Sequence, residues 1–129
     1  MKINESAENY LETILILEKK NIQVRMSDIA AMLNVSKPSV NKAMSILKEA
    51  GYILQQRYGA ILLTDAGREY ANKVYQRHLL FKRFFVEVLQ IDPVIAEEDA
   101  CHMEHCISDT TMAKLNVFLN EVLEKNKQS

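Results

Sequence analysis

The feature of the sequence that most constrains its fold is a pair of short amphipathic segments separated by a break at Asn34 and Val35. The first segment, SDIAAMLN, carries an acidic residue in its first turn and apolar residues at helical spacing. The second, VSKPSVNKAMSILKEAG, offers Ser36 as an N-cap, places Pro38 where a missing N–H does little harm, and ends at a glycine. The pattern therefore predicts two short helices that meet at a tight turn.

A β-hairpin is predicted directly after the second helix. The segment YILQQRYGAILLT alternates in strand fashion about Tyr58 and Gly59, so residues 52–56 and 60–63 are assigned to two strands. Helix, turn, helix and hairpin is the order of a winged helix-turn-helix, in which the second helix enters the major groove of DNA and the hairpin touches the backbone. The residues expected to contact DNA are Ser36, Lys37, Pro38, Ser39, Asn41, Lys42, Arg57 and Tyr58.

The chemistry and charge of this segment favour DNA as its partner. Hydroxyl and amine groups can reach phosphates and base edges, and Asn41 can address an adenine edge. From Lys19 to Arg57 the chain has seven basic residues against two acidic ones, whereas from Arg77 onward it has six basic against nine acidic. A winged helix that binds proteins through an ordinary solvated face is the alternative. Because one helix-turn-helix reads few bases, a homodimer on a palindromic, double-stranded operator is expected.

The rest of the chain is predicted to be helical, because the sequence contains only three glycines and two prolines. Helices are expected at 5–19 with Ser6 as a cap, after Thr64 or Asp65 as a cap and through about Gln90, at roughly 93–107 and at 109–125. The expected fold class is mostly α, with a winged helix-turn-helix domain at 1–73 and a helical domain at 74–129. The second domain has apolar positions to bury in a dimer, which are Leu115, Phe118, Leu119 and Val122.

The segment DACHMEHCISD gathers several types of metal ligand. On a helix, Cys101, Glu104 and His105 would share one face, because they lie three and four positions apart. A thiolate, a carboxylate and an imidazole can form part of a divalent metal site, but one helix seldom completes a coordination sphere. Other helices would have to supply further ligands, and the candidates are His78 and the pair Asn9 and Glu12. Such a site would let a metal set the orientation of the recognition helices.

Each of these residues taken alone has a plainer interpretation. His78 could be a core histidine, Glu12 a solvated helix residue and Cys101 a small buried hydrophobe. His102 and Cys106 form a second pair, but they point about 100° away from the first face of a helix and are treated as bystanders.

Other classes of protein are disfavoured. No stretch approaches the roughly 20 apolar residues of a membrane span, and no apolar run follows a basic start, so a cytoplasmic protein is expected. Two alternatives stay open: a winged-helix regulator that senses oxidation through Cys101 or Cys106, and a small metalloenzyme. The enzyme is the weaker alternative because the sequence indicates no Ser-His-Asp set, phosphate loop or substrate cleft, so neither catalysis nor a small-molecule substrate is expected.

Several motifs together resemble the diphtheria toxin repressor family of metal-dependent transcriptional regulators. They are ENYLETI, SDIAAMLNVSKPSVNKAMSILKEAGYI, LLTDAGREYA, VYQRHLLFKRFF and DACHMEHCISD, and they cover nearly the whole chain. The resemblance implies a homodimer that binds Fe(II) or Mn(II) and, when loaded, represses genes for metal uptake. It makes the helical second domain the metal-binding and dimerisation domain. The metal ligands that it implies are Asn9, Glu12, His78, Cys101, Glu104 and His105.

Some positions depart from the patterns of the family's two branches. Asn9 stands where iron regulators usually have Met and manganese regulators usually have Asp, while Cys101 matches the iron branch. Lys82 replaces a carboxylate of the iron branch's ancillary site, although Glu97 and Glu98 could take part in such a site. The chain resembles the short manganese regulators, which lack an SH3-like domain. The metal is therefore open between iron and manganese, and Zn(II), Co(II) or Ni(II) are expected to bind in vitro.

Overall fold

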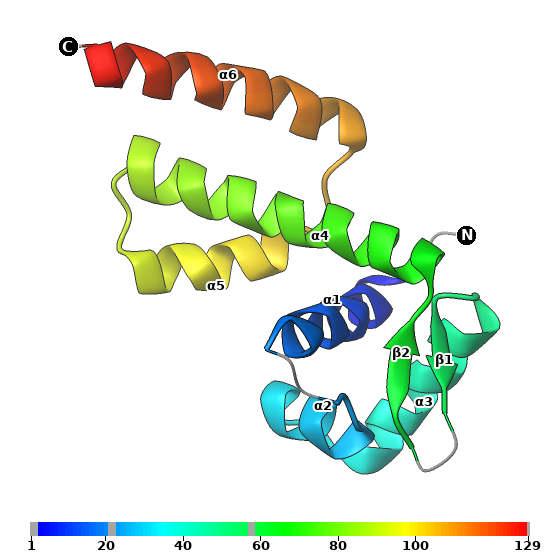
Figure 1. The fold of residues 1–129 in the computed structure, drawn as a ribbon. Helices are drawn as coiled ribbons and strands as arrows, with labels where there is room; N and C mark the ends of the chain where they lie inside the picture. Colours follow the sequence, from blue (N-terminus) through cyan, green and yellow to red (C-terminus); the bar gives the residue numbers. More distant parts are fainter. Residues whose placement is uncertain (1–2, 21–22, 57–58, 129) are drawn as a thin grey trace. The chain divides into compact units, whose positions relative to one another are not determined.

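A computed structural model describes residues 3–20, 23–56 and 59–128 of the chain. The chain forms two compact units, Met1–Lys73 and Val74–Ser129, and each is described by itself. The expected mostly α fold with one two-stranded hairpin is confirmed (Figure 1). Among the described residues, no helix combines the length and the apolar character needed to cross a membrane.

The first unit is built from three helices, a hairpin and the start of a long helix. The elements are α1 (Glu5–Lys19), α2 (Met26–Leu33), α3 (Lys37–Glu49), β1 (Ile53–Gln55), β2 (Ile61–Leu63) and α4 (Asp65–Arg83). The predicted bounds of α1 are confirmed, but the cap is Asn4, whose side chain accepts a hydrogen bond from the N–H of Ala7 at 2.8 Å. The expectation of Ser6 was wrong because the chain is already helical there, whereas Asn4 has the extended backbone that an N-cap requires.

The turn between α2 and α3 is as tight as the sequence predicted. Asn34 adopts the left-handed conformation with φ of 53°, which a short polar side chain tolerates. Ser36 then caps α3, since its hydroxyl accepts from the N–H of Ser39 at 3.3 Å. Val40 and Leu47 are fully buried on the inner face of α3, which packs against α1 and α2. These contacts fix the helix pair and leave the opposite face of α3 exposed.

The hairpin pairs its strands antiparallel, with Ile53 opposite Leu63 and Gln55 opposite Ile61. Arg57 and Tyr58, which were expected at its tip, lie outside the described residues. Thr64 follows the hairpin and caps α4, because its hydroxyl accepts from the N–H of Gly67 at 3.0 Å. That cap was one of the two options predicted.

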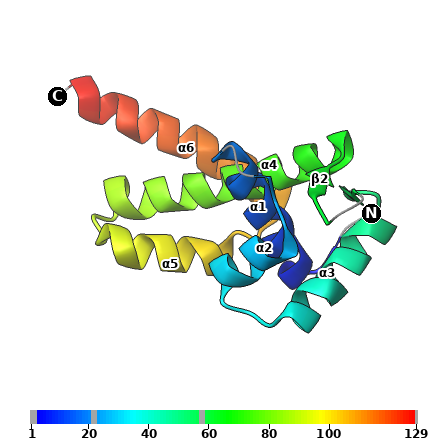
Figure 2. The same cartoon turned by 60° about the horizontal axis from the view of Figure 1, so that its bottom comes forward.

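The second unit consists of the remainder of α4 and three further segments, which are η1 (Phe84–Val88), α5 (Pro93–Met103) and α6 (Asp109–Gln128). The long helix was expected to continue to Gln90, but its α-helical part ends at Arg83 and the last turn widens into the π-helix η1. Both α5 and α6 pack on η1 (Figures 1 and 2). The core of this unit contains Phe81, Phe85, Ala96 and Ala100.

The helix α5 is shorter than the predicted 93–107. The N–H of Glu104 still bonds to the carbonyl of Ala100 at 3.1 Å, but the N–H of Cys106 bonds to the carbonyl of Met103, only three residues earlier. This shorter bond tightens the chain into a turn and ends the helix at Met103. Glu104 is therefore the C-cap residue, and His105 lies in the turn rather than on a helical face.

Candidate functional site

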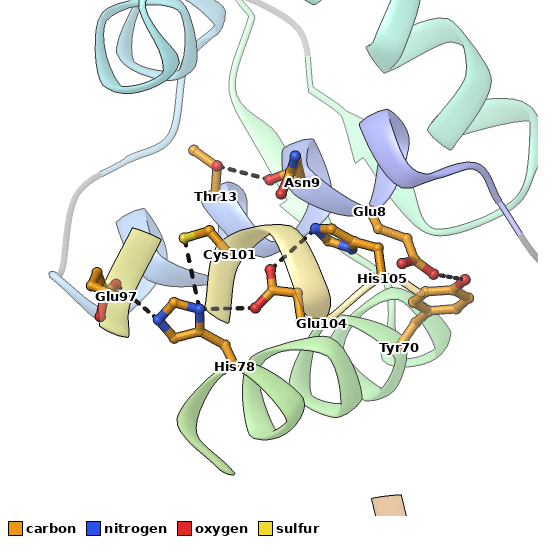
Figure 3. Close-up of polar contacts among 9 residues, drawn as sticks. All are labelled: Glu8, Asn9, Thr13, Tyr70, His78, Glu97, Cys101, Glu104 and His105. Carbon is orange, nitrogen blue, oxygen red and sulfur yellow. Dashed lines mark hydrogen bonds and ion pairs between the residues drawn. The ribbon is translucent and has the colours of Figure 1, made fainter. Parts of the chain in front are cut away.

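A cluster of ionisable side chains lies between α4 and the end of α5 in the second unit (Figure 3). α4 contributes His78, α5 contributes Glu97 and Cys101, and the turn after α5 contributes Glu104 and His105. The apolar core of the unit, which includes Phe81 and Phe85 of the same long helix segment, holds the backbone of α4 and η1 against α5.

The imidazole of His78 is the centre of this cluster. Its Nδ1 atom lies 2.9 Å from Oε2 of Glu104 and 3.8 Å from Sγ of Cys101. Its Nε2 atom lies 2.8 Å from Oε1 of Glu97. The other carboxylate oxygen of Glu104 lies 3.2 Å from Nε2 of His105. The imidazole thus has a carboxylate on each side, and Glu104 connects the two histidines (Figure 3).

Burial makes these contacts energetically important. Glu104 is 1% exposed and His78 is 5% exposed. Burying a charged group costs several kcal/mol unless an opposite charge or hydrogen bonds replace its water. Hydrogen bonds to Cys101 and Glu104 raise the pKa of His78 to about 11, because they favour the imidazolium more than burial disfavours it. The cluster therefore attracts positive charge to its centre.

A partly exposed lysine extends the cluster on the far side of His78. The ammonium of Lys82 lies 2.8 Å from Oε2 of Glu97. Burial opposes ionisation of Glu97, but the hydrogen bond from Lys82 and the charge of His78 outweigh it and hold the pKa of this carboxyl below its ordinary value. The hydrogen bond to Glu97 likewise raises the pKa of Lys82. Glu97 was not among the six expected ligands, but the sequence pointed to it, together with Glu98, as a possible member of an ancillary site.

The donor atoms suit a divalent transition metal. Ligand atoms of His78, Glu97 and Cys101 all lie within 4.8 Å of one another. Imidazole and carboxylate suit manganese and iron, while a thiolate raises the affinity for softer ions. Cys101 is exposed as a residue, and its sulfur lies 3.8 Å from Nδ1 of His78. His102 and Cys106, which were treated as bystanders, are both exposed.

The two remaining expected ligands belong to the first unit. Asn9 and Glu12 are one turn apart on α1, where Asn9 is exposed and Glu12 is buried. The backbone carbonyl of Asn9 accepts a hydrogen bond from the hydroxyl of Thr13 at 2.8 Å. Burial of Glu12 argues against its being an ordinary solvated helix residue.

A second surface with chemical potential is the N-terminal half of α3. Its outer face consists of exposed residues, namely Ser36, Lys37, Pro38, Ser39, Asn41 and Lys42. The hydroxyls of Ser36 and Ser39 are 2.9 Å apart and bond to each other, which orders the first turn. The two lysines make this face positive, so the helix presents cations, hydroxyls and an amide to solvent. Such a surface can bind a phosphate backbone and the base edges next to it.

Comparisons with known proteins identify two domains in the chain. Residues 2–61 match the model of the iron-dependent repressor N-terminal DNA-binding domain, and residues 64–128 match that of the iron-dependent repressor metal-binding and dimerisation domain. The chain is 33% identical to the HTH-type transcriptional regulator MJ0568 of Methanocaldococcus jannaschii, over 95% of this chain and 99% of that protein. It is 33% identical to the transcriptional regulator MntR of Escherichia coli O157:H7, over 88% of this chain and 73% of MntR.

Solved structures give the same result for the fold. The manganese regulator SloR superimposes with a TM-score of 0.80 at 29% identity, over 93% of this chain. The match covers 55% of the SloR chain, so the present chain spans about half the length of that structure. Two matching domain models lie in the expected order, and both curated relatives are transcriptional regulators. The chain belongs to the iron-dependent repressor family, whose members are metal-dependent, DNA-binding transcriptional regulators and not enzymes.

Proposed function

We propose that this chain is a repressor of metal-ion uptake genes that binds its operator when Fe(II) or Mn(II) is bound. The observation that carries the proposal is the buried contact of His78 with Glu104 and Cys101 in the second unit. An imidazole, a carboxylate and a thiol that converge in a buried place are three ligand types that one divalent cation can share.

The proposed ligands are the six that the family resemblance implied, which are Asn9, Glu12, His78, Cys101, Glu104 and His105. The contacts within the second unit support the last four as a group, because Glu104 touches both histidines. Asn9 and Glu12 are assigned on the resemblance alone. When bound, the metal would supply positive charge that holds these anionic and neutral donors together, and the residues would hold it in place.

We propose the exposed face of α3 as the surface that reads DNA. The first unit would act as the DNA-binding domain at 1–73, and the second as the metal-binding and dimerisation domain at 74–129. Two copies on a palindromic operator would place two recognition helices in successive major grooves. Apolar side chains on the second unit support self-association, since Phe118 on α6 is 50% exposed and Val94 on α5 is 76% exposed.

The choice between iron and manganese rests on opposing features. The thiol of Cys101 favours iron, and the similarity to a manganese regulator favours manganese. Affinity alone does not decide, because zinc, cobalt and nickel would bind such a site at least as tightly as either ion. The ion available in the cell would then select the activator.

The test is binding of the purified, chelator-treated full chain to DNA from upstream of its own gene, under anaerobic conditions and at fixed salt. Titrations with Mn(II), with Fe(II) and without metal should give tight binding only when metal is present. The ion that is effective at the lower free concentration is the better activator. Binding that ignores metal would contradict the proposal and would leave the cluster as a structural or redox-sensitive feature.

A further inference from the structure

The two ring nitrogens of His78 face different surroundings. Nδ1 points to Glu104 and Cys101, while Nε2 is 2.8 Å from Oε1 of Glu97. The second oxygen of Glu97 is 2.8 Å from the ammonium of Lys82. Glu97 therefore uses one oxygen for the histidine and the other for the lysine, and the three side chains form a continuous line from solvent to the cluster.

This arrangement has a consequence for the proton on the ring. A histidine binds a cation only through a nitrogen that carries no proton, and the neutral ring keeps one N–H. A carboxylate next to one nitrogen accepts that N–H and leaves the lone pair on the other nitrogen. Both ring nitrogens of His78 face a carboxylate, but Glu104 and Cys101 on the Nδ1 side are proposed ligands. A cation that they hold would therefore displace the proton from Nδ1, while Glu97 keeps the N–H on Nε2.

Accordingly, we propose that Glu97 is a positioning residue for His78 and is not itself a metal ligand. This inference rests on the proposed function, because it concerns the same cluster. Both oxygens of Glu97 already have partners, and a cation bound to Glu97 would have to compete with the ammonium of Lys82 at 2.8 Å. Lys82 also neutralises Glu97, so this carboxylate adds no net charge toward a second cation. The cluster then holds its cation on the Nδ1 side of His78 only.

Loss of an outer partner of a metal-binding histidine typically costs about 10–100-fold in metal affinity. We therefore expect Glu97→Ala to lower the affinity of the full chain for Mn(II) by about that factor, with the number of ions bound per chain unchanged. Glu97→Gln keeps an oxygen that accepts the N–H of Nε2, and its affinity should stay close to that of the natural chain. Glu98→Ala is the matched control, since Glu98 is the exposed neighbour of Glu97 on α5.

Two measurements test the inference. Isothermal titration with Mn(II) gives affinity and stoichiometry, and 15N NMR of the histidines in the Zn(II)-loaded chain reports which nitrogen of His78 carries hydrogen. The expected result is hydrogen on Nε2 of the natural chain and rescue of affinity by Gln but not by Ala at position 97. A fall in the number of ions bound for both variants would make Glu97 a ligand and would overturn the inference. Equal affinities for Glu97→Ala and Glu98→Ala would overturn it as well.

Failure of the proposed function gives a different pattern. In that case the natural chain itself would bind neither Mn(II) nor Zn(II), or would bind them without any change in DNA affinity. The inference about Glu97 is judged from metal affinity and from the position of the proton on His78. It can therefore hold even if metal does not change DNA binding. Thermal unfolding of each variant without metal checks that the fold is kept.

Discussion

The outer face of α3 and the cluster around His78 both consist of polar and charged side chains, but the first is exposed and the centre of the second is buried. On α3, Lys37, Asn41 and Lys42 are exposed to solvent. In the cluster, Glu104 and His78 are almost completely buried and depend on each other. An exposed polar side chain contributes little to the fold and can be replaced at low cost, whereas a buried charge that loses its partner is strongly destabilising. Single residues on the outer face of α3 can therefore be replaced with little loss of stability. Replacing one residue of the cluster also affects the residues that it contacts.

The largest effect is expected in the cluster. Glu104→Ala removes the carboxylate that contacts His78 at 2.9 Å and His105 at 3.2 Å. We expect the stimulation of DNA binding by Mn(II) to fall by more than about 100-fold, because losing an outer contact alone can reach that range. Fluorescence anisotropy with labelled operator DNA measures this effect, and Glu98→Ala is the control. A Glu104→Ala chain that still responds to Mn(II) would exclude Glu104 from the site.

A large loss of stability is expected at Gly67, where the first unit depends on close packing. A Cβ atom at this position would lie 1.9 Å from the carbonyl oxygen of Tyr52, so Gly67→Ala should lower the free energy of unfolding by about 1–3 kcal/mol or more. Gly51→Ala is the comparison, since a Cβ there meets nothing within 4 Å but the backbone has φ of +82°. That strain should cost roughly 1 kcal/mol. Urea unfolding of both variants checks the order; equal losses would show that contact with Tyr52 is unimportant.

A smaller effect is expected on the outer face of α3. Lys37→Ala or Lys42→Ala should weaken DNA binding for all sequences and reduce the slope of log affinity against log salt by about 0.9 each. The matched control is Lys48→Ala, which changes a lysine at the other end of the same helix. Binding isotherms at several salt concentrations provide the slopes. An unchanged slope in both variants would mean that this face does not contact phosphate.

The two lysine changes also provide the sharpest comparison with the cluster. Distant exposed residues should have additive effects. The loss of DNA-binding free energy in the Lys37→Ala/Lys42→Ala double variant should therefore equal the sum of the two single losses within about 0.5 kcal/mol. In contrast, the His78→Ala/Glu104→Ala double variant should lose no more of the stimulation of DNA binding by Mn(II) than the more damaging single variant. Each single change already disrupts the same site. Additive losses in the cluster would contradict its description as one unit.

The smallest effect concerns a polar contact inside the first unit. Tyr70 donates a hydrogen bond to Glu8 (Figure 3), and burial followed by this bond raises the pKa of Tyr70 to about 12. The phenol ionises near pH 10 when unfolded, so its contribution to stability is complete below about pH 10 and is lost as the pH rises toward 12. Tyr70→Phe should show less alkaline loss of stability. Urea unfolding at pH 8 and pH 10.5 measures the difference, and no difference between the two chains would show that neither burial nor the bond perturbs the phenol.

Local signals explain which parts of the fold could be predicted. The bounds of α1 and the Ser36 cap follow from periodicity and cap chemistry within a few residues. The end of α5 could not be predicted, because the apolar pattern is compatible both with a helix of residues 93–107 and with one that ends at Met103. In the structure, the hydrogen bond from Cys106 to the carbonyl of Met103 forms a turn and ends the helix. The role of Asn4 was missed because two polar residues near the start of α1 can both act as caps.

The cluster was less predictable than the fold, since it depends on residues far apart in sequence. The sequence identified His78, Cys101 and Glu104 as types of ligand, and their role as ligands stays a prediction. The contact between Lys82 and Glu97 requires α4 and α5 to lie side by side in a particular register, which no local pattern contains. The widening of α4 into η1 was missed for the same reason, because Phe84 and Phe85 are compatible with an ordinary α-helix.

The early end of α5 affects how this part of the chain fluctuates. Beyond Met103 the backbone is held by the bonds of a turn, so the amides that follow should exchange with solvent through small local openings and not through unfolding of the whole unit. Glu104 and His105 lie in this easily opened segment, although their side chains reach the interior. The buried contacts of Glu104 and His105 are thus attached to backbone that is held by a turn and not by a helix. A cation bound by Glu104 and His105 would hold this turn closed, and the ordering of this short segment would be its first physical effect on the chain.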